Sequence, residues 1–427
     1  MVWKSELHRE LMSWLTEGGS LQERIPRRDG RVRSESEAQL VCAALDKALA
    51  QTPIEQYTQA SYNLGSVIGL FQSVESESAA ALLRTQGLPR LRSLVQTYLQ
   101  RRHVDADTVM FVAKILASYG DPDDVQIVLR LARDSACEDR YLWSVIFSAF
   151  ASHDSNIARV VDGLRHPLPR KYCGIAFLDF CNQTAISGAL ARHPFDSHEG
   201  HSLLREWLSS SDESQFSYAI SATAAIPFID QDVSAELATI AGAHVDVTVR
   251  IESAWAQAKL GQLSSVEQLA DIARNPLYAH LAIRYLEELG HSDRVPEEAR
   301  TPDATALAEM AQWLAHPNEL GHPPEAISVA DTRELYWPPT NDRRRLWVIR
   351  FAHRSDGELV EDYGLVGSTT WAMFGESPAR DPMDVYAIHC CWELQSNEDP
   401  RAPSERSPAA GRRILAERNP EFRLRGA

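Results

Sequence analysis

The densest group of side chains that could do chemistry lies in the stretch HPFDSHEGH, residues 193–201. Imidazole and carboxylate groups follow one another closely there, and zinc takes both kinds of group as ligands. Their spacing matches no established zinc motif, and a solvated connection between two helices explains the same composition. We therefore expect no bound metal and no cofactor. The side chains that would be ligands if this expectation is wrong are His193, Asp196, His198 and His201.

A second stretch with reactive side chains is AIHCCWEL, residues 387–394, in which His389 precedes two adjacent cysteines. Neighbouring residues of an α-helix point about 100° apart, so the two thiols cannot readily bind one metal ion from an intact helix. Cysteine is also among the residues most often buried in proteins. The stretch therefore predicts a core helix, with the thiols packed beneath Trp347 or Trp371 and His389 making one hydrogen bond at the edge of the core.

Arginine and tryptophan gather in the C-terminal part of the chain, where they could bind a partner. The guanidinium fork of arginine pairs with carboxylates and stacks on aromatic rings. On an acidic protein, however, arginines also pair with the protein's own carboxylates. The tryptophan before the Pro-Pro pair is expected at the surface, because consecutive prolines cannot lie inside a sheet. The candidate partner-binding residues are Trp337, Arg343, Arg344, Arg345, Trp347 and His389.

Composition limits the classes of function. The chain has 427 residues, a formal charge of −16 and a pI near 5.4, so its average surface repels nucleic-acid phosphates and anionic membranes. The N-terminal residues lack the apolar core of a secretory signal, and no later run is apolar enough to span a membrane. The sequence contains no CxxC, GxSxG, P-loop or HExxH motif. We expect a cytoplasmic protein that binds neither a membrane nor nucleic acid.

From residue 36 to 300 the sequence predicts helix after helix, with apolar residues three and four positions apart and short polar or glycine breaks. The pattern is clearest in DVTVRIESAWAQAKLG, residues 246–261, and it repeats in NPLYAHLAIRYLEELG, residues 275–290. Asn275 and Pro276 are expected to start the second of these helices, and a shorter helix lies between the two. A pair of helices thus recurs about every thirty residues, which is the period of a helical solenoid.

The first of these segments resembles the bacterial HEAT repeats first grouped with phycobilisome lyases, whose pattern is Asp-x-x-Val-Arg-x-x-Ala-x-x-Ala-Leu-Gly. The second copy departs from the pattern at Tyr278-Ala279, where Val-Arg is usual. The resemblance implies an armadillo-type α-solenoid, and it is better for residues 210–295 than for the copies upstream. The residues that match the pattern are Asp246, Val249, Arg250, Ser253, Leu260 and Gly261.

After Pro296 the helical pattern gives way to prolines and then to strand-like alternation, with SDG, residues 355–357, as a turn between two strands. The segments DTRELYWPP, RRRLWVIRF, GLVGSTTWAMFGE and VYAIHCCWEL together resemble a C-terminal module that follows HEAT repeats in uncharacterised bacterial proteins. The tail is predicted to be disordered apart from one helical turn near residues 412–417. The predicted domains are a helix and loop (1–35), a HEAT-like solenoid (36–300), a connecting helix and Pro-rich linker (301–330), a small α+β module (331–395) and a disordered tail (396–427).

The predicted fold class is therefore mainly α: a HEAT-like α-solenoid of stacked antiparallel helix pairs followed by a small α+β module. A solenoid offers a long surface to another protein, and an acidic one favours a partner with a basic surface. We predict a non-catalytic scaffold or adaptor. One alternative is an enzyme or enzyme subunit, metal-dependent or similar to a bilin lyase, with a site near the junction that uses His353, His389 or residues 193–201. The other is a nucleic-acid-associated HEAT protein in defence or repair.

Overall fold

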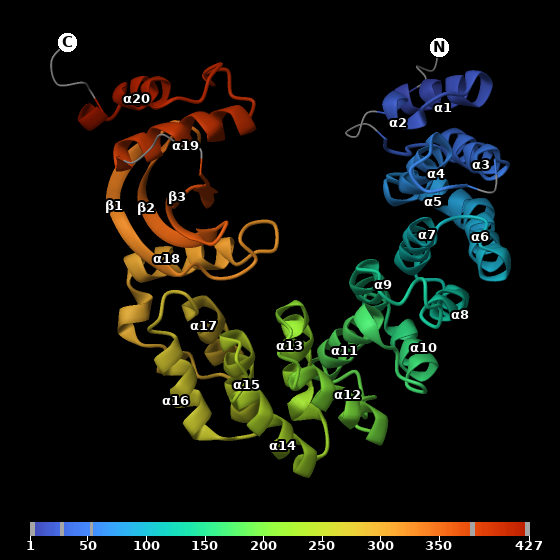
Figure 1. The fold of residues 1–427 in the computed structure, drawn as a ribbon. Helices are drawn as coiled ribbons and strands as arrows, with labels where there is room; N and C mark the ends of the chain where they lie inside the picture. Colours follow the sequence, from blue (N-terminus) through green and yellow to red (C-terminus); the bar gives the residue numbers. More distant parts are fainter. Residues whose placement is uncertain (1–4, 26–29, 52–53, 376–380, 423–427) are drawn as a thin grey trace. The chain divides into compact units, whose positions relative to one another are not determined.

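The computed structural model describes residues 5–25, 30–51, 54–375 and 381–422. Its contacts divide the chain into two compact units, Met1–Val249 and Arg250–Ala427. Helices predominate, and a four-stranded antiparallel sheet lies in the C-terminal unit (Figure 1). The prediction of a mainly helical chain with a small C-terminal α+β module is therefore confirmed. Within the described ranges, no helix combines the length and the apolar character needed to cross a membrane.

The N-terminal unit is built from short helices in two layers. One layer contains α4, α7, α9, α11 and α13, each in contact with the next, and the other contains α6, α8, α10, α12 and α14. The helices are α1 (Glu6–Glu17), α2 (Leu21–Arg24), α3 (Glu35–Leu49), α4 (Gln59–Gly69), α5 (Glu77–Leu82), α6 (Leu88–Arg101), α7 (Ala106–Tyr119), α8 (Pro122–Leu131), α9 (Leu142–Ala151), α10 (Asp154–Leu164), α11 (Lys171–Ile186), α12 (His198–Leu208), α13 (Phe216–Ala225) and α14 (Gln231–Gly242). Helix α15 (Val247–Lys259) crosses the division between the units.

Local side chains explain where these helices begin. The side chain of Asp105 accepts a hydrogen bond from the backbone N of Thr108 and so caps α7. Helix α8 starts with Pro122, and Asp121 before it is the capping residue. Such caps satisfy amide groups that have no partner within the first turn of a helix, so the breaks between helices are encoded locally.

The C-terminal unit combines helices with the sheet. Its strands pair in the order β1-β2-β3-β4, each antiparallel to the next. Its helices and strands are α16 (Leu263–Ile272), α17 (Ala279–Glu288), α18 (Pro302–Leu314), β1 (Ala326–Trp337), β2 (Asp342–Ser355), β3 (Glu358–Val366), β4 (Trp371–Met373), α19 (Pro382–Ser396) and α20 (Pro408–Ala416). The predicted turn joins β2 to β3, and Asp356 and Gly357 both take positive φ values, of 50° and 84°, as a tight hairpin requires.

The sheet is covered by a helix on each face, α18 on one side and α19 on the other (Figure 1). Strand β2 shows why both faces are buried. Its Leu346 and Val348 belong to the core beneath α19, whereas Ile349 and Phe351 belong to the core beneath α18. Successive side chains of a strand point to opposite faces of the sheet. A strand with apolar residues at both odd and even positions therefore needs a packing partner on each face.

Two parts of the predicted domain division differ from the structure. The helix predicted within residues 301–330 is present as α18, but it is part of the module, because it places Ala306, Met310 and Leu314 in the core against the sheet, and β1 already begins at Ala326. The described part of the tail is folded rather than disordered. Helix α20 packs on α19 and buries Leu415 in the same core as that helix.

The start of α17 also differs from the prediction. The helix begins at Ala279, with Tyr278 as its N-terminal flanking residue, and not at Asn275. The side chain of Asn275 instead accepts a hydrogen bond of 3.1 Å from the backbone N of Leu277. An asparagine that bonds to the backbone two residues ahead stabilises a turn, which competes with a helix start at the same position.

Candidate functional site

The histidines of residues 193–201 do not converge. His193 is buried, its Nε2 lies 3.1 Å from Oδ1 of Asn182, and burial lowers its pKa to about 4. His201 lies 3.2 Å from Asp196, and His198 is the exposed first residue of α12. Throughout the described chain, no group of three or more His, Cys, Asp or Glu side chains is arranged to hold a metal ion.

The two tryptophans that were predicted to bind a partner occupy different environments. Trp337 is fully buried, and its Nε1 donates a hydrogen bond of 2.8 Å to Glu393 of α19, so the prediction that it is exposed is wrong. Trp337 is the last residue of β1, and the Pro-Pro pair follows the strand instead of interrupting it. Trp347 is half-buried, and its Nε1 donates a hydrogen bond of 2.8 Å to Asp303 of α18.

The three arginines at the start of β2 lie at the surface beside the protein's own carboxylates. Arg344 pairs with Asp342 through two hydrogen bonds of 2.9 and 2.7 Å. Arg343 lies 3.5 Å from Glu334, and Arg345 stands opposite the same glutamate in the register of β1 and β2. Exposed pairs of this kind contribute little to stability and leave most of each charge accessible to solvent.

His389 lies inside the C-terminal core and not at its edge. Only 1% of its surface is exposed, its ring centroid lies 4.8 Å from that of Trp371, and burial lowers its pKa to about 3. Its Nε2 has no hydrogen-bond partner among the described residues. Cys390 and Cys391 are buried as free thiols, and burial raises the pKa of both, so the prediction of a core helix is confirmed.

His353 forms a buried pair with a carboxylate. Its Nε2 lies 2.9 Å from Oδ2 of Asp362 on the neighbouring strand, and the backbone N of Gly375 donates to the same carboxylate. Phe351 and Phe374 contact the imidazole ring, and Nδ1 has no partner among the described residues. A carboxylate that holds one imidazole nitrogen leaves the other as a potential base or ligand.

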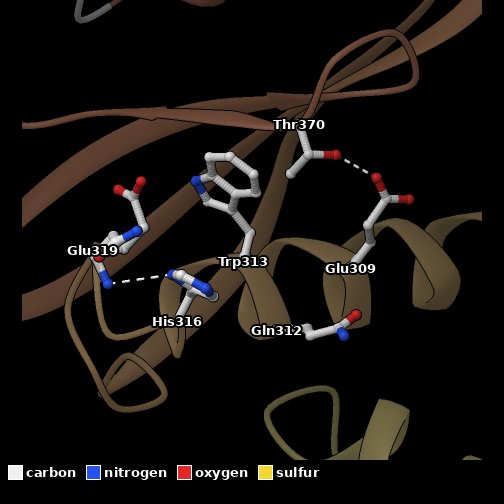
Figure 2. A pocket seen from close by; sticks show the side chains of 7 residues that line it. Glu309, Gln312, Trp313, His316, Glu319 and Thr370 are labelled. Atoms are coloured by element: carbon white, nitrogen blue, oxygen red, sulfur yellow. Dashed lines mark hydrogen bonds between the residues drawn. The ribbon is translucent and has the colours of Figure 1, made fainter. Parts of the chain in front are cut away.

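A ligand-sized space in the C-terminal unit lies at the C-terminal end of α18 (Figure 2). It is a pocket of about 360 Å³, close to the lower limit of common small-molecule and side-chain sites. We call it the indole pocket, because Trp313 forms its wall. Its lining residues are Glu309, Gln312, Trp313, His316, Asn318, Glu319 and Thr370.

The indole pocket is aromatic and acidic. Trp313 stands between Glu309 and Glu319, as Figure 2 shows, and no lysine or arginine belongs to the described lining. Glu309 accepts a hydrogen bond from the hydroxyl of Thr370, and Nε1 of Trp313 is buried without a partner among the described residues. The face of an indole ring attracts cations, and two nearby carboxylates strengthen that attraction, so the pocket favours a positively charged group.

A second hollow continues from the indole pocket between α17 and α18. We call this hollow the interhelical groove; its volume is about 580 Å³, and it shares Glu309 and Gln312 with the indole pocket. The wall from α17 includes His280, Arg284 and Glu287, which are spaced by four and three residues and therefore share one helix face. The two spaces together run along α18.

Sequence reasoning did not identify the residues of the indole pocket. Three of them lie in α18, within the segment that was expected to be a connection, three more lie in the turns that follow this helix, and Thr370 joins them from the loop between β3 and β4. A signal was present: Glu309, Gln312 and His316 recur at helical spacing beside the apolar stripe of α18. Of the residues predicted to bind a partner, none lines this pocket.

Comparisons with known proteins do not extend this description. No protein-family model matches the chain, and no curated protein is similar to it in sequence.

Proposed function

We propose that this chain is a non-catalytic scaffold that binds another protein, and that the indole pocket receives a basic side chain of that partner. The observation that carries the proposal is the acidic, tryptophan-walled pocket on the surface of α18. Lysine and arginine side chains combine a cation with an apolar stem. In the indole pocket the carboxylates can pair with the cation, and the Trp313 ring can contact both the cation and the stem. The net charge of −16 adds a long-range attraction for a basic partner.

The helical body supports the same proposal. Tandem helix pairs in two layers repeat along the N-terminal unit, and repeats of this kind typically present extended surfaces to partner proteins. We propose that these pairs, together with α15, α16 and α17, are repeats of the bacterial HEAT type. The six cysteines are buried, free thiols, which suits the reducing conditions of the cytoplasm.

Site-directed photocrosslinking in an extract of the source organism tests the proposal. A photoreactive amino acid replaces Gln312, which lines the indole pocket, and in a matched control it replaces Gln126, an exposed glutamine of α8. We expect one protein to crosslink at position 312 through a segment that contains lysine or arginine, and we expect Glu319→Lys to reduce the yield several-fold. Glu361→Lys, a charge reversal on β3, serves as the control for net charge.

The outcomes separate clearly. Equal crosslinking at positions 312 and 126 would overturn the proposal, and so would a crosslinked segment without a basic residue. A loss of yield with Glu361→Lys as large as that with Glu319→Lys would assign the attraction to net charge and not to the indole pocket.

The buried His353–Asp362 pair favours a second candidate function, that of a metal-dependent enzyme or enzyme subunit. Imidazole is a common metal ligand, and a hydrogen bond from its other nitrogen to a carboxylate orients it for that role. Elemental analysis of the purified chain and of His353→Gln tests this candidate. Stoichiometric zinc or iron that is lost in the variant would support it, and metal-free wild-type protein would count against it.

A further inference from the structure

The interhelical groove differs in charge from the indole pocket beside it. Arg284 and Arg300 both line the groove, together with His280. Arg300 donates hydrogen bonds to the backbone oxygens of Val295 and Ser292, which hold it against the chain. A ligand that passes along α18 therefore meets carboxylates without guanidinium groups in the indole pocket, and two guanidinium groups beside Glu287 and Glu309 in the groove.

Arg284 is the arginine that remains available to a ligand. Its guanidinium lies over the ring of Tyr285, with 5.1 Å between them, and its side chain is exposed. Glu287 lines the same groove and adds a carboxylate to that wall. Burial and then the Arg284 charge lower the pKa of His280, whereas Glu287 and Glu309 act in the opposite direction.

The combined length of the indole pocket and the interhelical groove along α18 determines how far apart the charges of a ligand must be. Thr305, Glu309 and Gln312 lie along one side of α18, and His316 follows the end of the helix; these residues line the two spaces in turn. From Thr305 to its end at Leu314 the helix rises about 14 Å, and an extended peptide covers that distance in about four residues. Residues four apart in an extended segment point to the same side, so one can face each space.

We propose that the partner segment carries a carboxylate about four residues from its basic anchor, with the basic side chain in the indole pocket and the carboxylate at Arg284. This inference rests on the proposed function, because it names the chemistry of the segment that the scaffold binds. A free amino acid or a polyamine would fill only one of the two spaces. An extended segment with an acidic and a basic residue can bind in the indole pocket and at Arg284 at the same time.

A displayed peptide library tests the inference on the full chain. The probes are twelve-residue peptides with one fixed arginine and random flanks, selected on the immobilised wild-type chain against a Glu319→Lys chain. We expect Asp or Glu to be enriched four positions from the arginine. For an enriched peptide, exchange of its acidic residue for the amide should weaken binding roughly two- to five-fold, as is typical of an exposed charge pair.

Variants of the chain separate the inference from the proposed function. In Arg284→Gln the acidic and amide peptides should bind equally, Arg284→Lys should retain part of the discrimination, and Arg413→Gln, an exposed arginine of α20, should behave as wild type. Undiminished discrimination in Arg284→Gln would overturn the inference while leaving the indole pocket intact. The proposed function would also be overturned if no peptide were enriched on the wild-type chain relative to the Glu319→Lys chain. The same holds if free arginine did not compete with the binding of any enriched peptide.

Discussion

The indole Nε1 of Trp337 donates a hydrogen bond of 2.8 Å to Oε2 of Glu393, and this bond joins the end of β1 to the last turn of α19. The other carboxylate oxygen of Glu393 accepts from the hydroxyl of Ser368 at 2.5 Å. Both partners of the first bond are buried, at 0% and 5% exposure. If a buried carboxylate loses a hydrogen-bond donor, the free-energy cost of removing it from water is no longer compensated. This contact therefore has a large effect on stability.

Trp337→Phe should therefore lower the free energy of unfolding of the C-terminal unit by about 1–3 kcal/mol. Urea denaturation followed by fluorescence of the remaining tryptophans measures the change. Tyr336→Phe is the matched control, because its hydroxyl donates a hydrogen bond to exposed Asn341 and the loss of this bond should cost less than about 0.5 kcal/mol. Equal effects of the two variants would contradict the assigned role of Glu393.

Gly411 allows α20 to lie directly against α19. A Cβ at this position would overlap the carbonyl oxygen of Ala387, which is backbone and cannot move aside. Gly411→Ala should displace α20 and destabilise the C-terminal unit by about 1–3 kcal/mol.

Hydrogen exchange of the α20 amides in Gly411→Ala tests this expectation, with increased exchange as the predicted result. Gly65→Ala in α4 is the control, because a Cβ there meets no atom within 4 Å and the change should stabilise its helix by up to about 1 kcal/mol. Unchanged protection of α20 in the Gly411 variant would show that the tail is not packed as described.

Asp179 of α11 should make the N-terminal unit less stable as pH rises. Burial raises its pKa to about 6, in spite of a hydrogen bond with Ser221. The native state therefore keeps a proton that the unfolded chain has already lost, and stability falls between about pH 4 and pH 6. Asp179→Asn should gain about 2–3 kcal/mol at pH 8 and almost nothing at pH 4.

Urea titrations at pH 4 and pH 8 measure that difference, and Asp139→Asn, an exposed aspartate, provides the comparison. A gain of equal size at both pH values would mean that the benefit comes from packing or hydrogen bonding of the amide and not from removal of a buried charge.

His389 should make the C-terminal unit sensitive to acid. Its pKa of about 3 lies well below the usual value near 6.5, because burial disfavours the protonated ring. Below pH 6.5 His389 binds a proton in the unfolded chain but stays neutral in the native state. The free energy of unfolding therefore decreases as pH falls from neutral. Between pH 7 and pH 4 wild type should lose about 3 kcal/mol more than His389→Leu.

Thermal or urea unfolding over this pH range, with His322→Leu as an exposed control, gives the measurement. If wild type and His389→Leu lose stability in parallel, His389 is not the group that titrates. His193 in the N-terminal unit shifts in the same direction and should add its own acid sensitivity there.

Features determined by neighbouring residues were predictable from the sequence. The helix at residues 382–396 follows from Asp381, whose side chain caps it, and from Pro382 at its first position. The turn at residues 355–357 follows from an aspartate and a glycine that both tolerate positive φ. In each case the decisive interaction spans only a few residues, so the local sequence contains the information.

Contacts between distant residues were decided only by the tertiary structure. Trp337 is buried against α19, where it bonds to Glu393, a residue fifty-six positions away in the sequence. Helix α18 is a core helix because the sheet packs against it. The indole pocket brings Thr370 to Glu309 across sixty-one positions. The sequence by itself determined the helical class, the caps and the acidic charge, because these depend on composition and on neighbours. Which tryptophan is exposed and where the carboxylates meet depend on how distant segments pack, and no local pattern encodes that.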